Sequence, residues 1–355
     1  MPDIMQFVPI LIVGFAGSLA LTPLSRQMAM RLGVVDKPNH RKIHLDNKPM
    51  MGGLAVYVAL VTALLLFSPP DHIAEFTAVL AGAAVLALLG LIDDRYDLPW
   101  RTKLPVMFLA ALGLVMTGVR VHFFGIPLLD GAITTIWIVA ITNATNYLDN
   151  MDGQSAGMTA IAAFYFMIIA FTQGLSLVTL LAAAVLGSAL GFLVYNFNPA
   201  STFMGDMGVL PLGFILSVLA IKLEFDQPFS VYWLVPVLIL ALPVFDINLV
   251  TWTRVLEHRS PAEAGKDHTA HRIMSIGFGQ RITLALIYGG CVLFGTMALL
   301  ISVSPEDVAL RLASFGVLLL LGLAVLMTWL RQRYQKPPPA TITTPSTDLE
   351  KVPHG

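Results

Sequence analysis

Four amide and carboxylate side chains follow one another at intervals of three residues, as Asn143, Asn146, Asp149 and Asp152. On a helix, this spacing places them along one face that turns slowly around the axis. The apolar run from Ile126 to Ile141 precedes them and is typical of a membrane span. So many oxygen ligands at the end of a span are unfavourable unless a cation binds there. The segment is therefore predicted to form one wall of a magnesium–pyrophosphate site.

The composition indicates the environment of that site. Of the 355 residues, 56% are hydrophobic and only 12% are charged, and the mean hydropathy is +0.77. A soluble domain carries about 25% charged residues, so the chain is predicted to be an integral membrane protein. The sequence contains no basic stretch with interleaved aromatic residues, which argues against a nucleic-acid partner. The single cysteine, Cys291, lies in an apolar run and excludes a disulfide framework.

Apolar runs long enough to cross a bilayer recur along the chain. A crossing needs roughly 20 residues, and we predict eleven such runs in an all-α membrane domain covering residues 1–332. Their centres lie near residues 14, 60, 82, 111, 135, 164, 185, 214, 240, 292 and 319. The first run, from Ile4 to Leu24, has no basic segment before it and no small-residue cleavage site, so it reads as a span. Residues 333–355 are predicted to be a disordered cytoplasmic tail.

The basic residues divide unequally between the two sides of this arrangement. Of the 21 Lys and Arg residues, all but Arg120, Lys222 and Arg311 fall on one side. The positive-inside rule places that side in the cytoplasm, with the amino terminus outside and the carboxyl terminus inside. The polar clusters also gather on the cytoplasmic side. They comprise Asp93 and Asp94; Asn143 to Asp152; Asn196, Asn198 and Asp206; and Asp267, His268, His271 and Arg272.

The inventory of these clusters indicates a type of chemistry. Carboxylate and amide oxygens suit Mg²⁺, which takes few protein ligands and keeps water and substrate phosphates. Arg101, Lys103, Arg272 and the histidines can neutralise phosphate oxygens, and a spare carboxylate can manage a proton. Together they suggest phosphoryl transfer between a soluble nucleotide and a lipid. Asp246, beside a predicted kink at Pro243, either lines the cleft or pairs with a structural partner.

Several separate motifs, in order, resemble the polyprenyl-phosphate N-acetylhexosamine-1-phosphate transferases. The resemblance covers about residues 1 to 330, and its Asp-Lys-Pro-Asn opening is closer to the GlcNAc-1-phosphate branch than to the muramoyl-pentapeptide branch. The matching stretches are Asp36-Lys-Pro-Asn-His-Arg-Lys-Ile-His44, Pro49-Met-Met-Gly-Gly-Leu54, Asp93-Asp94, Arg101-Thr-Lys-Leu104, Asn143-Ala-Thr-Asn146, Asp149 with Asp152-Gly153, Asn196-Phe-Asn-Pro199 and Phe203-Met-Gly-Asp206.

The resemblance implies a role for each matching residue. Asn146 and Asp206 are expected to be ligands of Mg²⁺, with Mn²⁺ as an alternative ion. The expected catalytic residues are Asp93, Asp94, His268 and His271, and either aspartate could handle a proton. The expected substrate-binding residues are Lys48, Lys103, Asn143, Asp149, Asp152, Asn196 and Arg272.

Two departures from the family pattern concern the sugar. The family often reads Asp-Gly-x-Asp-Gly, whereas this chain has Asp149-Asn-Met-Asp152-Gly153. The family's His-x-His-His is here His268-Thr-Ala-His271-Arg272. Neither departure removes the elements expected to bind metal and lipid phosphate.

The resemblance implies transfer of a sugar-1-phosphate, with GlcNAc-1-phosphate expected, from a UDP-sugar to undecaprenyl phosphate, with release of UMP. This would supply a cell-surface glycan from the cytoplasmic face of the bacterial inner membrane, and a homodimer is one expected assembly. The alternatives are a muramoyl-pentapeptide phosphotransferase, another UDP-HexNAc-specific member, a CDP-alcohol phosphotransferase or a membrane carrier. A CDP-alcohol phosphotransferase would have Ala-Arg three residues after Asp149-x-x-Asp152-Gly153, where this chain has Ala156-Gly157. A carrier would place its carboxylates near the membrane midplane, whereas here they are predicted to gather at one surface.

Overall fold

The computed structural model describes residues 4–36, 48–67, 73–225, 230–260 and 265–335, and most of these are helical. The helices are α1 (Val8–Leu32), α2 (Gly52–Phe67), α3 (Ile73–Tyr96), α4 (Trp100–Met116), α5 (Pro127–Tyr147), α6 (Gln154–Thr172), α7 (Ser176–Asn196), α8 (Asp206–Ile221), α9 (Leu234–Ile239), α10 (Ala241–Leu256), α11 (Thr269–Ser275), α12 (Gln280–Val303) and α13 (Glu306–Tyr334). Two short strands, β1 (Val35–Asp36) and β2 (Lys48–Pro49), pair antiparallel.

An all-α membrane protein is confirmed by the length and apolarity of these helices. Seven are long and apolar enough to cross a membrane, and the count is eight if a bent helix pair forms one span. The eleven predicted runs coincide with α1–α8, the pair α9–α10, α12 and α13. However, α2 and α8 have 16 residues each and α4 has 17, fewer than the roughly 20 of a full crossing. Eleven crossings therefore stay a prediction.

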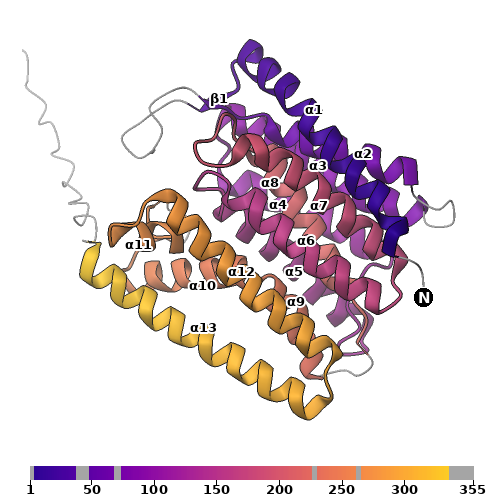
Figure 1. Cartoon of the computed structure of the whole chain (residues 1–355), viewed down its shortest axis with the longest axis vertical. Helices are drawn as coiled ribbons and strands as arrows, with labels where there is room; N and C mark the ends of the chain where they lie inside the picture. The colour runs from indigo at the N-terminus through magenta and orange to yellow at the C-terminus, as the bar shows by residue number, and fades with distance from the viewer. Residues whose placement is uncertain (1–3, 37–47, 68–72, 226–229, 261–264, 336–355) are drawn as a thin grey trace, which may run out of the picture.

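The three helices α6, α7 and α8 form the interior of the molecule. Most of their residues are buried, and each contributes a fully buried phenylalanine: Phe166, Phe192 and Phe214. By contrast, α1 and α13 bury few residues, and they lie along opposite edges of the molecule (Figure 1). Since the exposed residues of these two helices are largely apolar, their outer faces are suited to lipid.

A sharp bend of 82° separates α9 from α10. The sequence predicted a kink at Pro243, but the helix breaks earlier, at Leu240. The reason is that a proline ring clashes with the carbonyl group four residues before it and has no N–H to donate. For Pro243 that carbonyl belongs to Ile239, the last residue of α9, and Pro243 itself lies in the first turn of α10.

One end of the helix bundle gathers the segments that carry the predicted chemistry. In Figure 1, β1, α11 and the last turn of α13 lie at this end, on the left, and the described amino terminus lies at the opposite end. The helix α13 continues to Tyr334, two residues beyond the predicted domain end. Most of the predicted tail lies outside the described residues.

Candidate active site

A lysine and two carboxylates from three helices meet at this end of the bundle. The Lys103 Nζ lies 2.6 Å from Oδ2 of Asp93 and 3.5 Å from Oδ2 of Asp206. Lys103 begins the second turn of α4, Asp93 lies near the end of α3, and Asp206 opens α8. Residues more than 100 positions apart therefore share one ammonium group, which confirms that these sequence clusters converge.

Asp94 makes contacts of a different kind from those of Asp93. Its Oδ1 accepts a hydrogen bond from the backbone N–H of Asp206 (2.9 Å), and its Oδ2 accepts one from the N–H of Met207 (3.2 Å). These are the first two N–H groups of α8, which have no partner within their own helix. The N-cap position is held by Gly205, which has no side chain to accept them. Asp94 therefore caps α8 from α3 and fixes the position of Asp206.

Two glycines make this arrangement possible. Gly205 has φ +69°, and a Cβ there would lie 2.4 Å from Oδ2 of Asp94. On α3, a Cβ at Gly90 would lie 2.2 Å from the carbonyl carbon of Asp206. Both distances are shorter than non-bonded atoms adopt. Glycine at both positions lets the backbone of α8 approach α3 closely enough for the cap to form.

The two asparagines of α5 have different surroundings. The Asn146 Nδ2 donates to Oδ2 of Asp206 at 3.1 Å, the same oxygen that faces Lys103. The Asn143 Nδ2 donates instead to the carbonyl oxygen of Val139 (2.9 Å) and contacts Sδ of Met107 on α4 (3.3 Å). Asn146 thus belongs to the carboxylate cluster, whereas the amide nitrogen of Asn143 is engaged in packing between α4 and α5.

The remaining polar residues of the central motif hold two loops together. Asp152 Oδ2 accepts hydrogen bonds at 3.0 Å from Asn198 Nδ2 and from the backbone N–H of Ala200. Asn196 donates to the carbonyl oxygen of Thr202 and accepts from the N–H of Gly153. Asp152 and Asn196 therefore tie the segment between α5 and α6 to the segment between α7 and α8, which leads to Asp206.

Asp149 lies in the segment between α5 and α6, close to the cluster. Burial, together with the neighbouring negative charge of Asp152, raises the pKa of Asp149 to about 6. Asp149 and Asp93 also repel the carboxylate of Asp94 electrostatically. Negative charge is therefore concentrated here, which favours a bound cation.

Lys48 lies on β2, at the start of the segment that leads to the cluster. The next residue, Pro49, accepts hydrogen bonds from the N–H of Phe203 (2.8 Å) and Oγ1 of Thr202 (3.0 Å). This contact brings β2 beside the segment that ends at Asp206. Lys48 is half-buried, and its binding of substrate stays a prediction.

The two predicted histidines lie side by side at the start of α11. The His268 Nδ1 is 2.7 Å from Oδ2 of Asp246, and its ring contacts those of Tyr147 and His271 at 5.8 and 6.0 Å between centroids. Tyr147 directly follows Asn146, so the histidines lie beside the end of α5 that carries Asn146. Burial and the charge of His268 lower the pKa of His271 to about 4, which makes His271 neutral at pH 7.

Arg272 has partners that the sequence did not indicate. It is fully buried and donates to the carbonyl oxygens of Asp267 and Met327 and to Oγ1 of Thr253. These bonds join α10, α11 and α13. Its predicted contact with substrate phosphates remains a prediction, but its three nitrogens all donate within the protein.

A buried ion pair holds the loop that leads to His268 and His271, called the histidine loop below. Asp267 accepts two hydrogen bonds from Arg254, at 2.7 and 2.9 Å, and Arg259 and Arg331 approach it to 3.3 and 3.8 Å. Burial by itself would raise the pKa of Asp267. The hydrogen bonds and charge of Arg254, with the charges of His268 and Arg331, outweigh this effect and lower the pKa to about 2.

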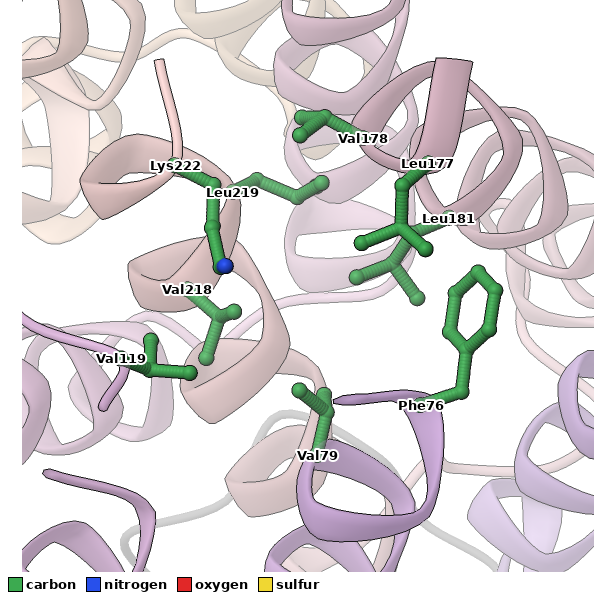
Figure 2. A pocket seen from close by; sticks show the side chains of 9 residues that line it. All are labelled: Phe76, Val79, Val119, Leu177, Val178, Leu181, Val218, Leu219 and Lys222. Carbon is green, nitrogen blue, oxygen red and sulfur yellow. The ribbon is translucent and has the colours of Figure 1, made fainter. Parts of the chain in front are cut away.

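A separate pocket lies at the opposite end of α3 and α8 (Figure 2). Its lining is apolar except for Lys222, whose amine points toward Val218 and the pocket interior. The pocket contains no carboxylate or imidazole and cannot support the chemistry proposed for the carboxylate cluster. The polar end of the bundle is therefore the candidate active site.

Known proteins with similar sequences point to the same chemistry. Residues 76–224 match glycosyl transferase family 4. A probable undecaprenyl-phosphate N-acetylglucosaminyl 1-phosphate transferase of Bacillus subtilis is 34% identical over 292 residues, covering 80% of this chain and 81% of that protein. A decaprenyl-phosphate N-acetylglucosaminephosphotransferase of Mycobacterium tuberculosis is 31% identical over 348 residues, covering 86% and 85%. An undecaprenyl-phosphate alpha-N-acetylglucosaminyl 1-phosphate transferase of Escherichia coli is 27% identical over 339 residues, covering 88% and 89%.

The chain belongs to glycosyl transferase family 4. The family match contains Asp93, Asp94, Lys103, Asn146 and Asp206, which are the residues that converge in the structure. It ends before the histidine loop, so the roles of His268 and His271 depend on the loop's own geometry.

Three residues around the site of this family 4 protein were not predicted as site residues. Tyr147 and Arg254 carry no sequence signal, because an aromatic residue or an arginine at a span end is common at membrane interfaces. Asp246 does carry one, since a carboxylate within an apolar run is rarely placed without a function. The sequence left its role open, and the structure pairs it with His268.

The cap on α8 predicts a stability effect in this family 4 protein. Replacing Asp94 with Ala should lower the free energy of unfolding by about 1–2 kcal/mol, as the loss of a helix cap does. Asp94→Asn should lower it less, since the amide keeps one acceptor oxygen. Thermal unfolding of the detergent-solubilised protein measures both, with the exposed Asp307→Ala as control. Equal stability of Asp94→Ala and the wild type would contradict the cap.

The ion pair in the histidine loop predicts a pH-dependent effect. Arg254→Met should destabilise the protein by about 3 kcal/mol at pH 7, toward the lower end for a broken buried pair because Arg259 and Arg331 remain near Asp267. Because the folded-state pKa of Asp267 is lowered to about 2, the pair stabilises fully above about pH 4 and less as the pH falls toward 2. Unfolding measured between pH 7 and pH 3 should therefore show the difference between variant and wild type narrowing. A constant difference would refute this account.

Proposed function

We propose that this protein transfers GlcNAc-1-phosphate from UDP-GlcNAc to undecaprenyl phosphate and releases UMP. The names of the three relatives described above each combine a polyprenyl phosphate with N-acetylglucosamine, which favours this reaction over the muramoyl-pentapeptide one. The observation that carries the proposal is the meeting of Asp93, Lys103, Asn146 and Asp206, from four helices, at one end of the bundle.

The donor set of the cluster fits Mg²⁺. Asp206 and Asn146 supply a carboxylate and an amide oxygen, and Mg²⁺ is usually held by one or two protein carboxylates together with substrate phosphates. Among the described residues, no group of three or more His, Cys, Asp or Glu side chains is placed to hold a metal ion. Bound there, Mg²⁺ would supply positive charge to the diphosphate.

The protein's own residues would divide the remaining work. An oxygen of the lipid phosphate attacks the phosphorus that carries the sugar, and the bond from that phosphorus to the bridging oxygen breaks, so UMP leaves with the electron pair. Lys103 is placed to bind diphosphate oxygens as a point charge. Asp93 accepts hydrogen bonds from Lys103 on Oδ2 and from the backbone N–H of Leu98 on Oδ1. Its position beside Lys103 would let it take a proton from the lipid phosphate, whereas Asp94 bonds to the start of α8.

The membrane arrangement is part of the same proposal. Eleven crossings, with the amino terminus outside, would place the candidate site on the cytoplasmic face of the bacterial inner membrane. The correspondence between the eleven predicted runs and the helices supports this arrangement, as does the distribution of Lys and Arg. A homodimer remains an expectation.

Turnover tests the reaction and the role of Asp206. Purified protein with Mg²⁺, undecaprenyl phosphate and a panel of radiolabelled UDP-sugars should release UMP with UDP-GlcNAc. Asp206→Ala should lower kcat by on the order of 100-fold or more, as removal of an electrostatic catalytic group does. Asp307→Ala, at the exposed end of α13, is the control that should keep full activity. Absence of UMP release with every sugar would overturn the proposed reaction.

Cysteine labelling tests the orientation. In a Cys291→Ala background, Arg101→Cys and Arg311→Cys each place one exposed thiol at opposite ends of the bundle. A membrane-impermeant maleimide should label position 311 in intact cells and position 101 only after the membrane is permeabilised. The reverse pattern would place the candidate site outside.

A further inference from the structure

A buried carboxylate of α10 reaches the histidine loop. Asp246 is fully buried and lies just after the bend between α9 and α10. Its Oδ2 is 2.7 Å from Nδ1 of His268, and its Oδ1 accepts the backbone N–H of Thr269 at 2.6 Å. Both oxygens are therefore engaged at the first residues of α11.

This contact decides which nitrogen of His268 carries a proton. An ionised carboxylate can only accept hydrogen bonds, so the short contact requires a proton on Nδ1 of His268. The nitrogen on the other side of the ring, Nε2, is then the one left for a substrate. Because the His268 ring lies against Tyr147, next to Asn146, that nitrogen belongs to the same end of the bundle as the carboxylate cluster.

We propose that Asp246 is a positioning residue for His268: its negative charge supports the imidazolium form, in which Nε2 also carries a proton, and it orients the ring so that the Nε2–H donates to a phosphate oxygen of the substrate. The inference depends on the proposed function, because the phosphate is that of the nucleotide sugar. Asp246 itself is shielded from the substrate by His268 and Thr269 and acts only through the imidazole. Carboxylates that orient metal-binding histidines contribute about 10- to 100-fold, and we expect an effect of the same size for the orientation of His268.

The bend between α9 and α10 gives this role a structural basis. The axis of α10 is turned by 82° from that of α9. Asp246, on α10, therefore lies off the line along which α9 runs. The loop is anchored on its other side by the pairing of Arg254 with Asp267, the residue before His268. The loop is thus held from two sides, and of these two contacts only that of Asp246 bonds the imidazole.

A double-mutant cycle tests the proposal. Asp246→Asn keeps an acceptor for Thr269 but presents an N–H group that opposes the Nδ1 proton, so the imidazole must change tautomer or rotate. We expect Asp246→Asn to lower kcat 10- to 100-fold, with less than a threefold change in KM for UDP-GlcNAc. In a His268→Ala background the same substitution should change kcat less than twofold. An equal fold loss in both backgrounds would overturn the proposal.

Asp267→Asn is the matched control, because it removes a second buried carboxylate of the same loop that does not bond the ring. Because Asp267 interacts with His268 only through charge, the fold effect of Asp267→Asn on kcat should depend on His268 much less than that of Asp246→Asn does. UMP release by the wild type distinguishes a failure of the proposed reaction from a failure of the positioning role. No release overturns the proposed function, whereas normal release with an unaffected Asp246→Asn variant overturns only the positioning role.

A spectroscopic measurement covers the cases in which a variant does not fold or His268→Ala is too slow to assay. In protein labelled with ¹⁵N-histidine, the His268 signals are identified by their loss in His268→Gln. We expect the wild-type Nδ1 to carry a proton at pH 7.5. A bare Nδ1 would overturn the proposal independently of any activity.

Discussion

The cap that Asp94 places on α8 is the interaction on which the candidate site depends. Two backbone N–H groups at the start of α8 bind the carboxylate of a residue from another helix, and the side chain of Asp206 follows from that position. The close approach at Gly90 and the backbone of Gly205 allow the contact. Without it, Asp206 would not be held at the ammonium group of Lys103. The adjacent aspartates thus have different tasks, one in the helix scaffold and one facing the cluster.

Much of this architecture was predictable from the sequence. Apolar runs mark where the helices are, and the one-sided distribution of Asp, Asn and Lys indicates that α3, α4, α5 and α8 present their polar ends together. The family resemblance added the pairing of Asn146 with Asp206. The division of labour between Asp93 and Asp94 was not predictable, because neighbouring residues with the same side chain differ only in the partner that each one faces. The partner of Asp94 lies more than 100 residues away in the sequence.

The histidine loop was harder to predict for a different reason. Its shape depends on buried polar contacts among α10, α11 and α13, in which Arg254, Arg272 and Asp246 each bond to groups distant in the sequence. Residue types alone suggested that Arg272 binds phosphate, but a guanidinium that donates to two carbonyls and a hydroxyl within the protein serves packing first. The break before α10 was also displaced from Pro243, since the proline acts on the carbonyl four residues before it.

The shortness of α8 has a consequence for how a lipid substrate could be reached. Its 16 residues span about 24 Å, roughly 6 Å less than the hydrocarbon thickness of a bilayer. If α8 crosses the bilayer as predicted and its carboxyl end reaches the far surface, its first residue would lie beneath the level of the near headgroups. A long-chain isoprenoid phosphate could then react with its tail still in the membrane, because the reacting centre would lie at the depth of the lipid.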